Sequence, residues 1–205
     1  MIAVVDCGMG NLHSVRLAFD RLGAEVAVVQ QPEELRQAER IVFPGVGAFG
    51  ECTARLLESG FAAALEEEVL RGGKPLLGIC LGMQVLAQRG EEYGVSAGLG
   101  WIRGVVRRLG GDGHQVKVPH VGWNDVQWQP DSPLFARLCQ PAAFYFVHGY
   151  HLMPDDPNVS AATCEHGEVF TAAIQWNNVF AVQFHPEKSQ RNGLRLLGNF
   201  MAWKP

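Results

Sequence analysis

The stretch Pro75-Leu-Leu-Gly-Ile-Cys80-Leu-Gly82-Met-Gln84 joins a short apolar run to a segment with helical spacing through the pattern Gly-x-Cys-x-Gly. A short apolar run that ends at glycine predicts a buried strand followed by a tight turn. The whole pattern is typical of the strand–turn–helix element that presents a nucleophile in α/β hydrolases, with cysteine where serine often stands. It therefore predicts an α/β sheet with Cys80 at the carboxyl end of one strand.

The first 90 residues repeat this alternation of strand and helix. Short β-branched runs predict four strands, at residues 2–6, 26–30, 40–43 and 75–79. Segments with helical periodicity lie between them, at residues 12–22 and 53–71. Such repetition implies parallel strands joined by crossover helices.

The second half of the chain has a different pattern, in which Gly, Pro and Asp separate short strand-like runs. These runs are residues 105–109, 115–118, 124–128, 143–147 and 179–184, and an amphipathic helix over 190–203 closes the chain. Hairpins and antiparallel additions are expected here. We therefore expect a three-layer α/β fold in one domain, residues 1–205, with a mostly parallel central sheet, flanking helices and antiparallel additions in the second half.

Composition excludes several classes of protein. The chain has 205 residues, 47% of them hydrophobic and 19% charged, and a formal net charge of -4. This balance favours a packed core and gives no basic surface for nucleic acid. No apolar run approaches the roughly 18 residues of a membrane span, and MIAVVDCGMGN at the start reads as a first strand rather than a signal peptide. The five cysteines include no CxxC pair, which favours a reducing cytoplasm.

Cys80 is the first candidate for chemistry. Gly78 and Gly82 remove side chains that would collide across a strained turn, and the positive end of a following helix would favour a thiolate. The alternative is a buried structural cysteine, the commoner fate of a single cysteine.

A second candidate is Phe-Ala-Val-Gln-Phe-His-Pro-Glu at 180–187. Proline biases His185 toward an extended conformation, in which residues two apart project to the same side. Glu187 could therefore orient the His185 imidazole, which gives a nucleophile, a base and an orienting carboxylate with Cys80. The alternative is a surface histidine beside a proline turn.

The glycine-rich segment PGVGAFG at 44–50 formally contains GxGxxG. A dinucleotide site is disfavoured, because the segment follows the third predicted strand and no acidic strand end lies suitably downstream. Backbone N–H groups of Val46 or Gly47, together with that of Leu81, could instead form an oxyanion hole. A simple strand-to-helix turn is the alternative. His148-Gly-Tyr-His151 lacks an HExxH pattern, so we expect no metal, and nothing indicates a cofactor.

GICLGMQ at 78–84 together with HPE at 185–187 resembles the class I (triad) glutamine amidotransferases. The likeness runs nearly end to end and includes DCGMGNLHSV at 6–15, PGVGAFG at 44–50, PHVGWN at 119–124, FYFVHGY at 144–150 and HPEKSQ at 185–190. PHVGWN and PGVGAFG are most similar to the glutaminase subunits of imidazole glycerol phosphate synthase. Glutaminases that feed pyridoxal phosphate, anthranilate or guanylate synthesis stay open as alternatives, as does a non-enzymatic subunit on the same scaffold.

The resemblance implies a role for each matching residue. Cys80 would attack the glutamine side-chain amide, His185 would carry the proton to the leaving ammonia, and Glu187 would hold His185. The oxyanion would lie against the N–H groups of Val46, Gly47 and Leu81. The α-amino-acid end of glutamine would be held by Gln84, Glu92, Gly149 and Tyr150.

The resemblance also implies a partner. In this family a (β/α)₈-barrel cyclase subunit forms a heterodimer with the glutaminase and receives ammonia through a tunnel. It uses the ammonia to make imidazole glycerol phosphate and an aminoimidazole carboxamide ribotide. Family likeness puts four residues at or near the interface: Asn11, Trp123, Tyr145 and Lys188. Without the likeness, Lys188 would be read as a solvated rim charge.

Overall fold

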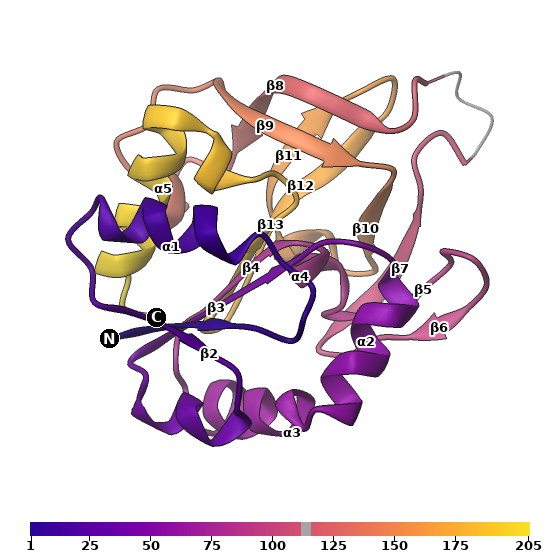
Figure 1. The fold of residues 1–205 in the computed structure, drawn as a ribbon. Helices are drawn as coiled ribbons and strands as arrows, with labels where there is room; N and C mark the ends of the chain where they lie inside the picture. The colour runs from indigo at the N-terminus through magenta and orange to yellow at the C-terminus, as the bar shows by residue number, and fades with distance from the viewer. Residues whose placement is uncertain (112–115) are drawn as a thin grey trace.

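The computed structural model describes residues 1–111 and 116–205, and a long sheet crosses the molecule with helices on both faces (Figure 1). In order across this sheet the strands are β2 (Val26–Val29), β1 (Ile2–Val5), β3 (Arg40–Gly45), β4 (Leu76–Cys80), β13 (Val179–Val182), β12 (Val169–Trp176), β11 (Ser160–Glu165), β8 (His120–Trp128) and β9 (Ala142–His148). The strands from β2 to β13 run parallel, and those from β12 to β9 are antiparallel to their neighbours. The predicted sheet, mostly parallel with antiparallel additions, is confirmed.

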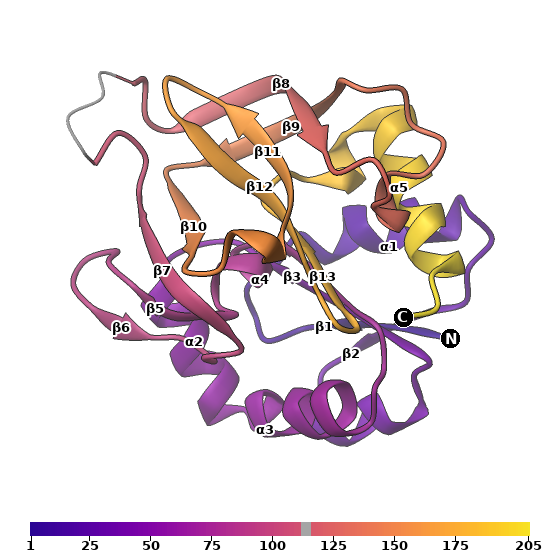
Figure 2. The same cartoon turned by 180° about the vertical axis from the view of Figure 1, so that it is seen from behind.

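Helices make the two outer layers, as Figures 1 and 2 show from opposite sides. One face carries α1 (Leu12–Asp20) and α5 (Gln190–Ala202), and the other carries α2 (Phe49–Glu58), α3 (Phe61–Leu65) and the π-helical η2 (Glu66–Arg71). Each layer buries its own aromatic side chains, Phe19 and Phe200 on the first face and Phe49 and Phe61 on the second. β1 and β4 are buried along their whole length, as expected for parallel strands covered on both faces.

A smaller sheet lies beside the carboxyl end of β4. Its order is β10 (Tyr150–Pro154), β7 (Ile102–Arg108), β5 (Ala87–Gly90) and β6 (Ser96–Ala97). Short helices complete the described chain: η1 (Pro32–Gln37), α4 (Leu81–Gln84), η3 (Pro133–Phe135), η4 (Pro157–Val159) and η5 (Pro186–Lys188). Only Gly149 separates β9 of the main sheet from β10 of the small one, so the chain passes directly from one sheet into the other. Within the described residues no helix has the length and apolar character needed to cross a bilayer.

Three predicted elements differ from the structure. The expected helix over residues 53–71 is broken at Gly60, whose φ of +80° is left-handed, so the chain turns there into a second helix. The expected strand over 115–118 begins at a residue outside the described ones, and residues 116–118 are not in a strand. Pro119 follows them without an N–H to donate. The predicted strand over 179–184 ends at Val182, because the chain leaves the sheet before His185.

Candidate active site

Cys80 ends β4 in a strained backbone conformation, with φ 55° and ψ −109°. A Cβ added at Gly82 would lie 2.0 Å from the Phe43 carbonyl oxygen, so only glycine allows this approach of the turn to β3. The predicted strand–turn–helix is present. Its helix, α4, is four residues long, because the chain enters β5 at Ala87.

His185 follows β13, the parallel neighbour of β4, and the register pairs Val182 with Ile79. The carboxyl ends of these adjacent strands therefore bring His185 to the side of Cys80. The Nδ1 atom of His185 lies 2.8 Å from Oε1 of Glu187, and both side chains are almost fully buried. The backbone of His185 is also held, since its N–H donates to the Tyr145 carbonyl at 2.8 Å. The structure thus brings the three predicted catalytic residues together.

The environment of His185 favours its charged form. Burial alone would lower its pKa, but the neighbouring Cys80 thiol and the Glu187 carboxylate outweigh burial and raise the pKa of His185 to about 9. Its Nε2 atom is buried without a hydrogen-bond partner among the described residues, and it is the ring nitrogen that Glu187 does not occupy. Nε2 is therefore the ring atom available to carry a proton to or from Cys80 and a substrate.

A cavity of about 270 Å³ opens above Cys80 and His185. Its lining includes the predicted oxyanion and substrate residues: Val46, Gly47, Leu81, Gln84, Glu92, Gly149 and Tyr150. Lys188, predicted at the interface, also lines it, whereas Glu187 lies behind His185. The residues predicted for catalysis, the oxyanion and the substrate therefore lie around one cavity, although they come from segments scattered between residues 46 and 188.

The turn from β3 into α2 forms one wall of this cavity. Gly47 has φ +104°, and a Cβ there would lie 2.6 Å from Cε of Met9. Just beyond the turn, the backbone N–H of Phe49 donates to Oε2 of Glu92 at 2.8 Å. Since the first N–H groups of a helix lack intrahelical partners, Glu92 holds the start of α2 in place.

Sequence reasoning missed Gln183, which is fully buried beside the nucleophile. Its Nε2 atom donates to Sγ of Cys80 at 3.6 Å, and its Oε1 atom accepts from Nε2 of Gln84 at 2.9 Å. Gln84 also donates to the Tyr150 carbonyl at 2.8 Å. The available signal was spacing, because Gln183 stands two residues before His185 and so projects to the same side of an extended segment.

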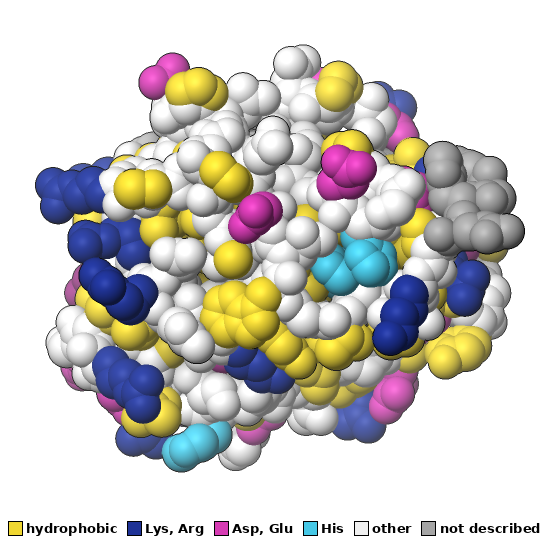
Figure 3. Space-filling view, turned by 90° about the horizontal axis from the view of Figure 1, so that it is seen from above, with side chains coloured by type: hydrophobic (Ala, Val, Ile, Leu, Met, Phe, Trp, Pro, Cys, Tyr) yellow, Lys and Arg dark blue, Asp and Glu magenta, His cyan; other side chains and the backbone are white. Residues whose placement is uncertain are grey.

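Beside the cavity, the outer faces of β8 and β9 carry exposed aromatic and apolar side chains. The rings of Trp123 and Tyr145 pack edge to face with centroids 6.1 Å apart, and Nζ of Lys188 lies 5.8 Å from the Tyr145 ring centroid. Val121 and Val147, which were not predicted, pair across the same two strands and are also exposed. Hydrophobic side chains run across this side of the molecule, with Lys and Arg toward its edges (Figure 3).

Asn11, the remaining residue predicted at the interface, precedes α1 on another loop. It follows Gly10, where an added Cβ would lie 3.3 Å from the Pro44 carbonyl oxygen.

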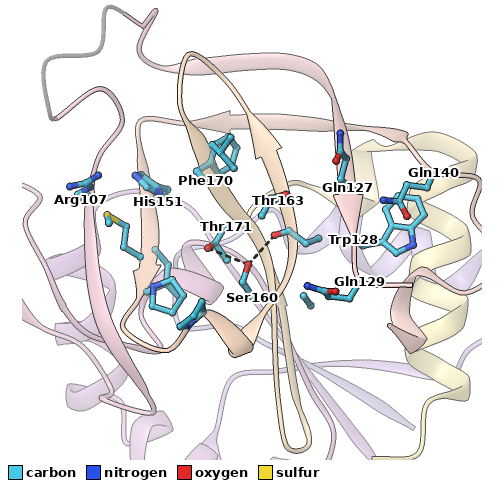
Figure 4. A pocket seen from close by; sticks show the side chains of 17 residues that line it. Arg107, Gln127, Trp128, Gln129, Gln140, His151, Ser160, Thr163, Phe170 and Thr171 are labelled. Atoms are coloured by element: carbon cyan, nitrogen blue, oxygen red, sulfur yellow. Dashed lines mark hydrogen bonds between the residues drawn. The ribbon is translucent and has the colours of Figure 1, made fainter. Parts of the chain in front are cut away.

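A larger cavity of about 530 Å³ lies among β7, β10, β11 and β12, and none of the predicted site residues lines it (Figure 4). Arg107, His151 and Ser160 face it, but the Ser160 hydroxyl lies 3.5 Å from Thr171 Oγ1 and 3.5 Å from the Ala162 carbonyl. Both contacts of this hydroxyl are to oxygen atoms, of a backbone carbonyl and of another hydroxyl. Across residues 1–111 and 116–205, no three His, Cys, Asp or Glu side chains are grouped as metal ligands.

Comparison with known proteins agrees with this geometry. The family described as glutamine amidotransferase class-I matches residues 3–203. Two solved structures share the fold: a glutamine amidotransferase (TM-score 0.75, 22% identity, 98% of this chain and 97% of that one) and PurLQS from Thermotoga maritima (TM-score 0.77, 19% identity, 98% and 97%). The fold and a cysteine–histidine–glutamate site define a class I glutamine amidotransferase, an enzyme with glutaminase activity.

Full-length relatives narrow the class. The chain is 46% identical to imidazole glycerol phosphate synthase subunit HisH of Syntrophotalea carbinolica over 98% of both chains. It is 47% identical to the HisH subunit of Geobacter sulfurreducens over 99% of both. The chain belongs to the HisH family, the glutaminase subunits of imidazole glycerol phosphate synthase in histidine biosynthesis. Membership of this family excludes the glutaminases of pyridoxal phosphate, anthranilate and guanylate synthesis, which the sequence analysis left open. Because the family consists of synthase subunits, the chain works with a partner subunit.

Proposed function

We propose that Cys80, His185 and Glu187 hydrolyse the side-chain amide of glutamine, and that the ammonia passes directly to a (β/α)₈-barrel cyclase in a heterodimer. The observation that carries this proposal is that Cys80 and His185 lie at the carboxyl ends of adjacent parallel strands. His185 is in turn bonded to Glu187, with Nδ1 and Oε1 2.8 Å apart. A nucleophile, a base and an orienting carboxylate are the parts that acyl transfer requires.

The chemistry follows from this arrangement. The Cys80 thiol gives its proton to Nε2 of His185, Sγ attacks the side-chain amide carbon, and the amide oxygen takes the negative charge. Backbone N–H groups at Val46, Gly47 and Leu81 stabilise that oxygen. His185, protonated at Nε2, gives its proton to the leaving nitrogen, so the C–N bond breaks and ammonia and a γ-glutamyl thioester form. His185 then takes a proton from water, whose oxygen attacks the thioester, and glutamate and the thiolate are released.

The same cavity offers complementary groups to the two charges of an α-amino acid. Both hydrogens of Gln84 Nε2 are used by Tyr150 and Gln183, so Gln84 has only its oxygen to offer a ligand. That oxygen and the Glu92 carboxylate are acceptors and suit the substrate ammonium. The Gly149 carbonyl accepts a hydrogen bond from the Leu109 N–H of β7 at 3.0 Å. Because hydrogen-bonding groups alternate in direction along an antiparallel strand, the N–H and C=O of Tyr150, the next residue, point away from β7. The Gly149–Tyr150 segment can therefore offer N–H groups to the substrate carboxylate.

The apolar face beside the cavity supports the docking of a partner. Exposed aromatic and aliphatic side chains that gather on one face are typical of interaction sites. We assign Trp123 and Tyr145, with Val121 and Val147, to contact with the cyclase, and Lys188 and Asn11 to its border. Ammonia freed into water at neutral pH is mostly ammonium, which is not a nucleophile, so a partner docked beside the cavity has to receive it directly. The five cysteines are free thiols, which fits a reducing cytoplasm. In this proposal residues 1–205 act as one domain. The reaction uses only side chains, backbone groups and water, so it needs no cofactor.

Glutamate release from glutamine tests the proposal, measured with the purified chain alone and with its cyclase subunit carrying the nucleotide substrate. We expect strong release only in the complex. Cys80→Ala should abolish it, whereas Cys164→Ala, at another buried cysteine in β11, should leave it intact. Release by the Cys80→Ala complex at the unsubstituted rate would contradict the triad assignment. Equal release with and without the cyclase would contradict dependence on the partner.

A further inference from the structure

Two buried histidines outside the triad are joined by hydrogen bonds to the glutamine cavity. Asn124 Nδ2 donates to His120 Nε2 at 3.3 Å, and His120 Nδ1 lies 3.1 Å from His148 Nε2. His148 Nδ1 lies 2.9 Å from the Tyr150 carbonyl oxygen. Gln84 donates to that same oxygen and continues through Gln183 to Sγ of Cys80. A continuous series of hydrogen bonds therefore runs from β8 to the nucleophile.

The proton positions along this series follow from its two ends. A carbonyl only accepts, so His148 carries its hydrogen on Nδ1, and a neutral ring then accepts at Nε2. His120 must therefore donate from Nδ1 and accept at its own Nε2. The Asn124 end independently requires the same arrangement, because its amide nitrogen also donates to the Glu165 carbonyl at 2.7 Å and its oxygen accepts from the backbone of Asp125 at 2.8 Å.

Both rings are held in the neutral state that this arrangement needs. Burial lowers the pKa of His148 to about 3 and that of His120 to about 4. His166 lies near both rings and His151 near His148, and a charge on any of these rings would add repulsion. The neutral pair therefore persists at physiological pH.

Aromatic packing fixes the rings in orientation. His120 is stacked between Phe146, with centroids 4.7 Å apart, and His166, with centroids 4.0 Å apart. Phe170 packs against the His148 ring at a centroid distance of 5.1 Å. A ring held on its faces can make its two hydrogen bonds with little loss of side-chain entropy. His120 and His148 also lie opposite each other on β8 and β9, the strands whose other faces carry Trp123 and Tyr145.

We propose that His120 and His148 are positioning residues for glutamine, because their hydrogen bonds hold the Tyr150 carbonyl and, through it, the amide of Gln84. The inference rests on the proposed function of this cavity. The Tyr150 carbonyl accepts two hydrogen bonds and is fully used, so it can act only as an anchor and not as a ligand of the substrate. Losing the bond from His148 leaves the Tyr150 carbonyl held by Gln84 alone, so the carbonyl can shift and carry the Gln84 amide with it, away from the substrate ammonium.

Paired substitutions at His148 test this role in the complex with the cyclase. In His148→Asn the amide nitrogen takes the place of Nδ1 and can still donate to Tyr150, whereas in His148→Gln it falls near the place of Nε2. We expect His148→Gln to raise the KM for glutamine about five- to tenfold, the loss of one hydrogen bond, with kcat near that of the unsubstituted complex. His148→Asn should restore most of the affinity. His151→Asn is the matched control, because this buried histidine of β10 faces the other cavity (Figure 4).

Equal KM values for the two His148 variants and the unsubstituted complex would overturn the proposal. Failure of the proposed function would look different, since the Cys80→Ala complex would then still release glutamate. If a His148 variant does not fold, the tautomers remain measurable in the full chain by long-range ¹H–¹⁵N spectra of ¹⁵N-histidine. We expect Nδ1 to be protonated and Nε2 bare in both rings at neutral pH, and protonation of Nε2 in either ring would also overturn the proposal.

Discussion

Oε2 of Glu92 accepts the backbone N–H of Phe49 at 2.8 Å, so the carboxylate assigned to the substrate ammonium also fixes the start of α2. Phe49 stands two residues after Gly47, at the end of the turn assigned to the oxyanion. Glu92 is therefore in a position to serve two functions, one through its charge and one as a hydrogen-bond acceptor for a helix terminus.

Glutamine and alanine at position 92 should separate these two functions. Glu92→Gln keeps an oxygen for Phe49 and loses the charge, so we expect the KM for glutamine to rise about 10- to 100-fold, the range for a hydrogen bond to a charged group, with an unchanged melting temperature. Glu92→Ala should raise KM similarly and also lower Tm by a few degrees and reduce kcat, because the helix start is released. Steady-state kinetics and thermal unfolding of the two variants measure these changes. An unchanged Tm in Glu92→Ala would count against a role of Glu92 in holding the start of α2.

The raised pKa of His185 predicts how activity ends at high pH. Loss of the imidazolium should give an alkaline limb in kcat/KM near pH 9. Glu187→Gln removes a charge that favours the imidazolium, so the limb should move down by about one pH unit or more. The exposed Glu67→Gln on η2 is the control and should leave the limb in place. A limb that stays near 9 in Glu187→Gln would show that another group titrates there.

The same shift has a consequence for stability. A group whose pKa is raised on folding stabilises the native state fully below its unfolded pKa, here 6.5, and loses that contribution as the pH rises through about 9. The free energy of unfolding should therefore fall between pH 6.5 and 9 by more in the unsubstituted chain than in Glu187→Gln. Urea titrations at a series of pH values measure this difference, and parallel curves for the two proteins would contradict it.

The residues that could be predicted from the sequence are those whose geometry is local. Cys80 is placed by glycines on either side of it, and the His185–Glu187 pair by a two-residue spacing across proline. The parallel strands could be predicted because buried strands are apolar along their whole length, as β1 and β4 are. Interactions between residues close together in the chain determine these features, so they can be predicted from a single sequence.

What was missed depends on pairing between distant segments. Gln183 is a polar residue beyond an apolar strand until the fold brings Gln84 to it from 99 residues away. His120 and His148 lie 28 residues apart and meet only because β8 pairs with β9. β11, with the sequence SAATCE, has neither a clear alternation nor a run of large apolar side chains, and it is a strand because β8 and β12 flank it.

Gly47 gives a test of the oxyanion turn. Alanine there meets both a left-handed φ of +104° and Met9 Cε at 2.6 Å, so the turn must move. We expect Gly47→Ala to lower kcat by about 100-fold or more, the range for losing one oxyanion donor, with a smaller change in KM. Gly73→Ala is the matched control, since it has φ +72° and nothing within 4 Å of the added Cβ. Both variants should lose about 1–2 kcal/mol of stability, but only Gly47→Ala should lose activity.

Trp123 tests the partner face without touching the cavity. Its side chain is 48% exposed yet packed edge to face on Tyr145, which makes it a rigid aromatic anchor at low entropic cost. Trp123→Ala should weaken binding of the cyclase by about 30-fold or more, as expected for a hot-spot residue worth about 2 kcal/mol. Leu57→Ala on α2, at 63% exposure, is the control and should bind normally.

The decisive measurement for Trp123→Ala is glutaminase activity titrated with the cyclase. Because the triad is untouched, activity should return to near the unsubstituted level once the cyclase is in excess of the weakened Kd. Activity that stays low at saturation would instead show that Trp123 acts on catalysis within the complex. An unchanged Kd would remove the β8–β9 face from the interface, and the partner would then have to reach the cavity past the loop that carries Asn11.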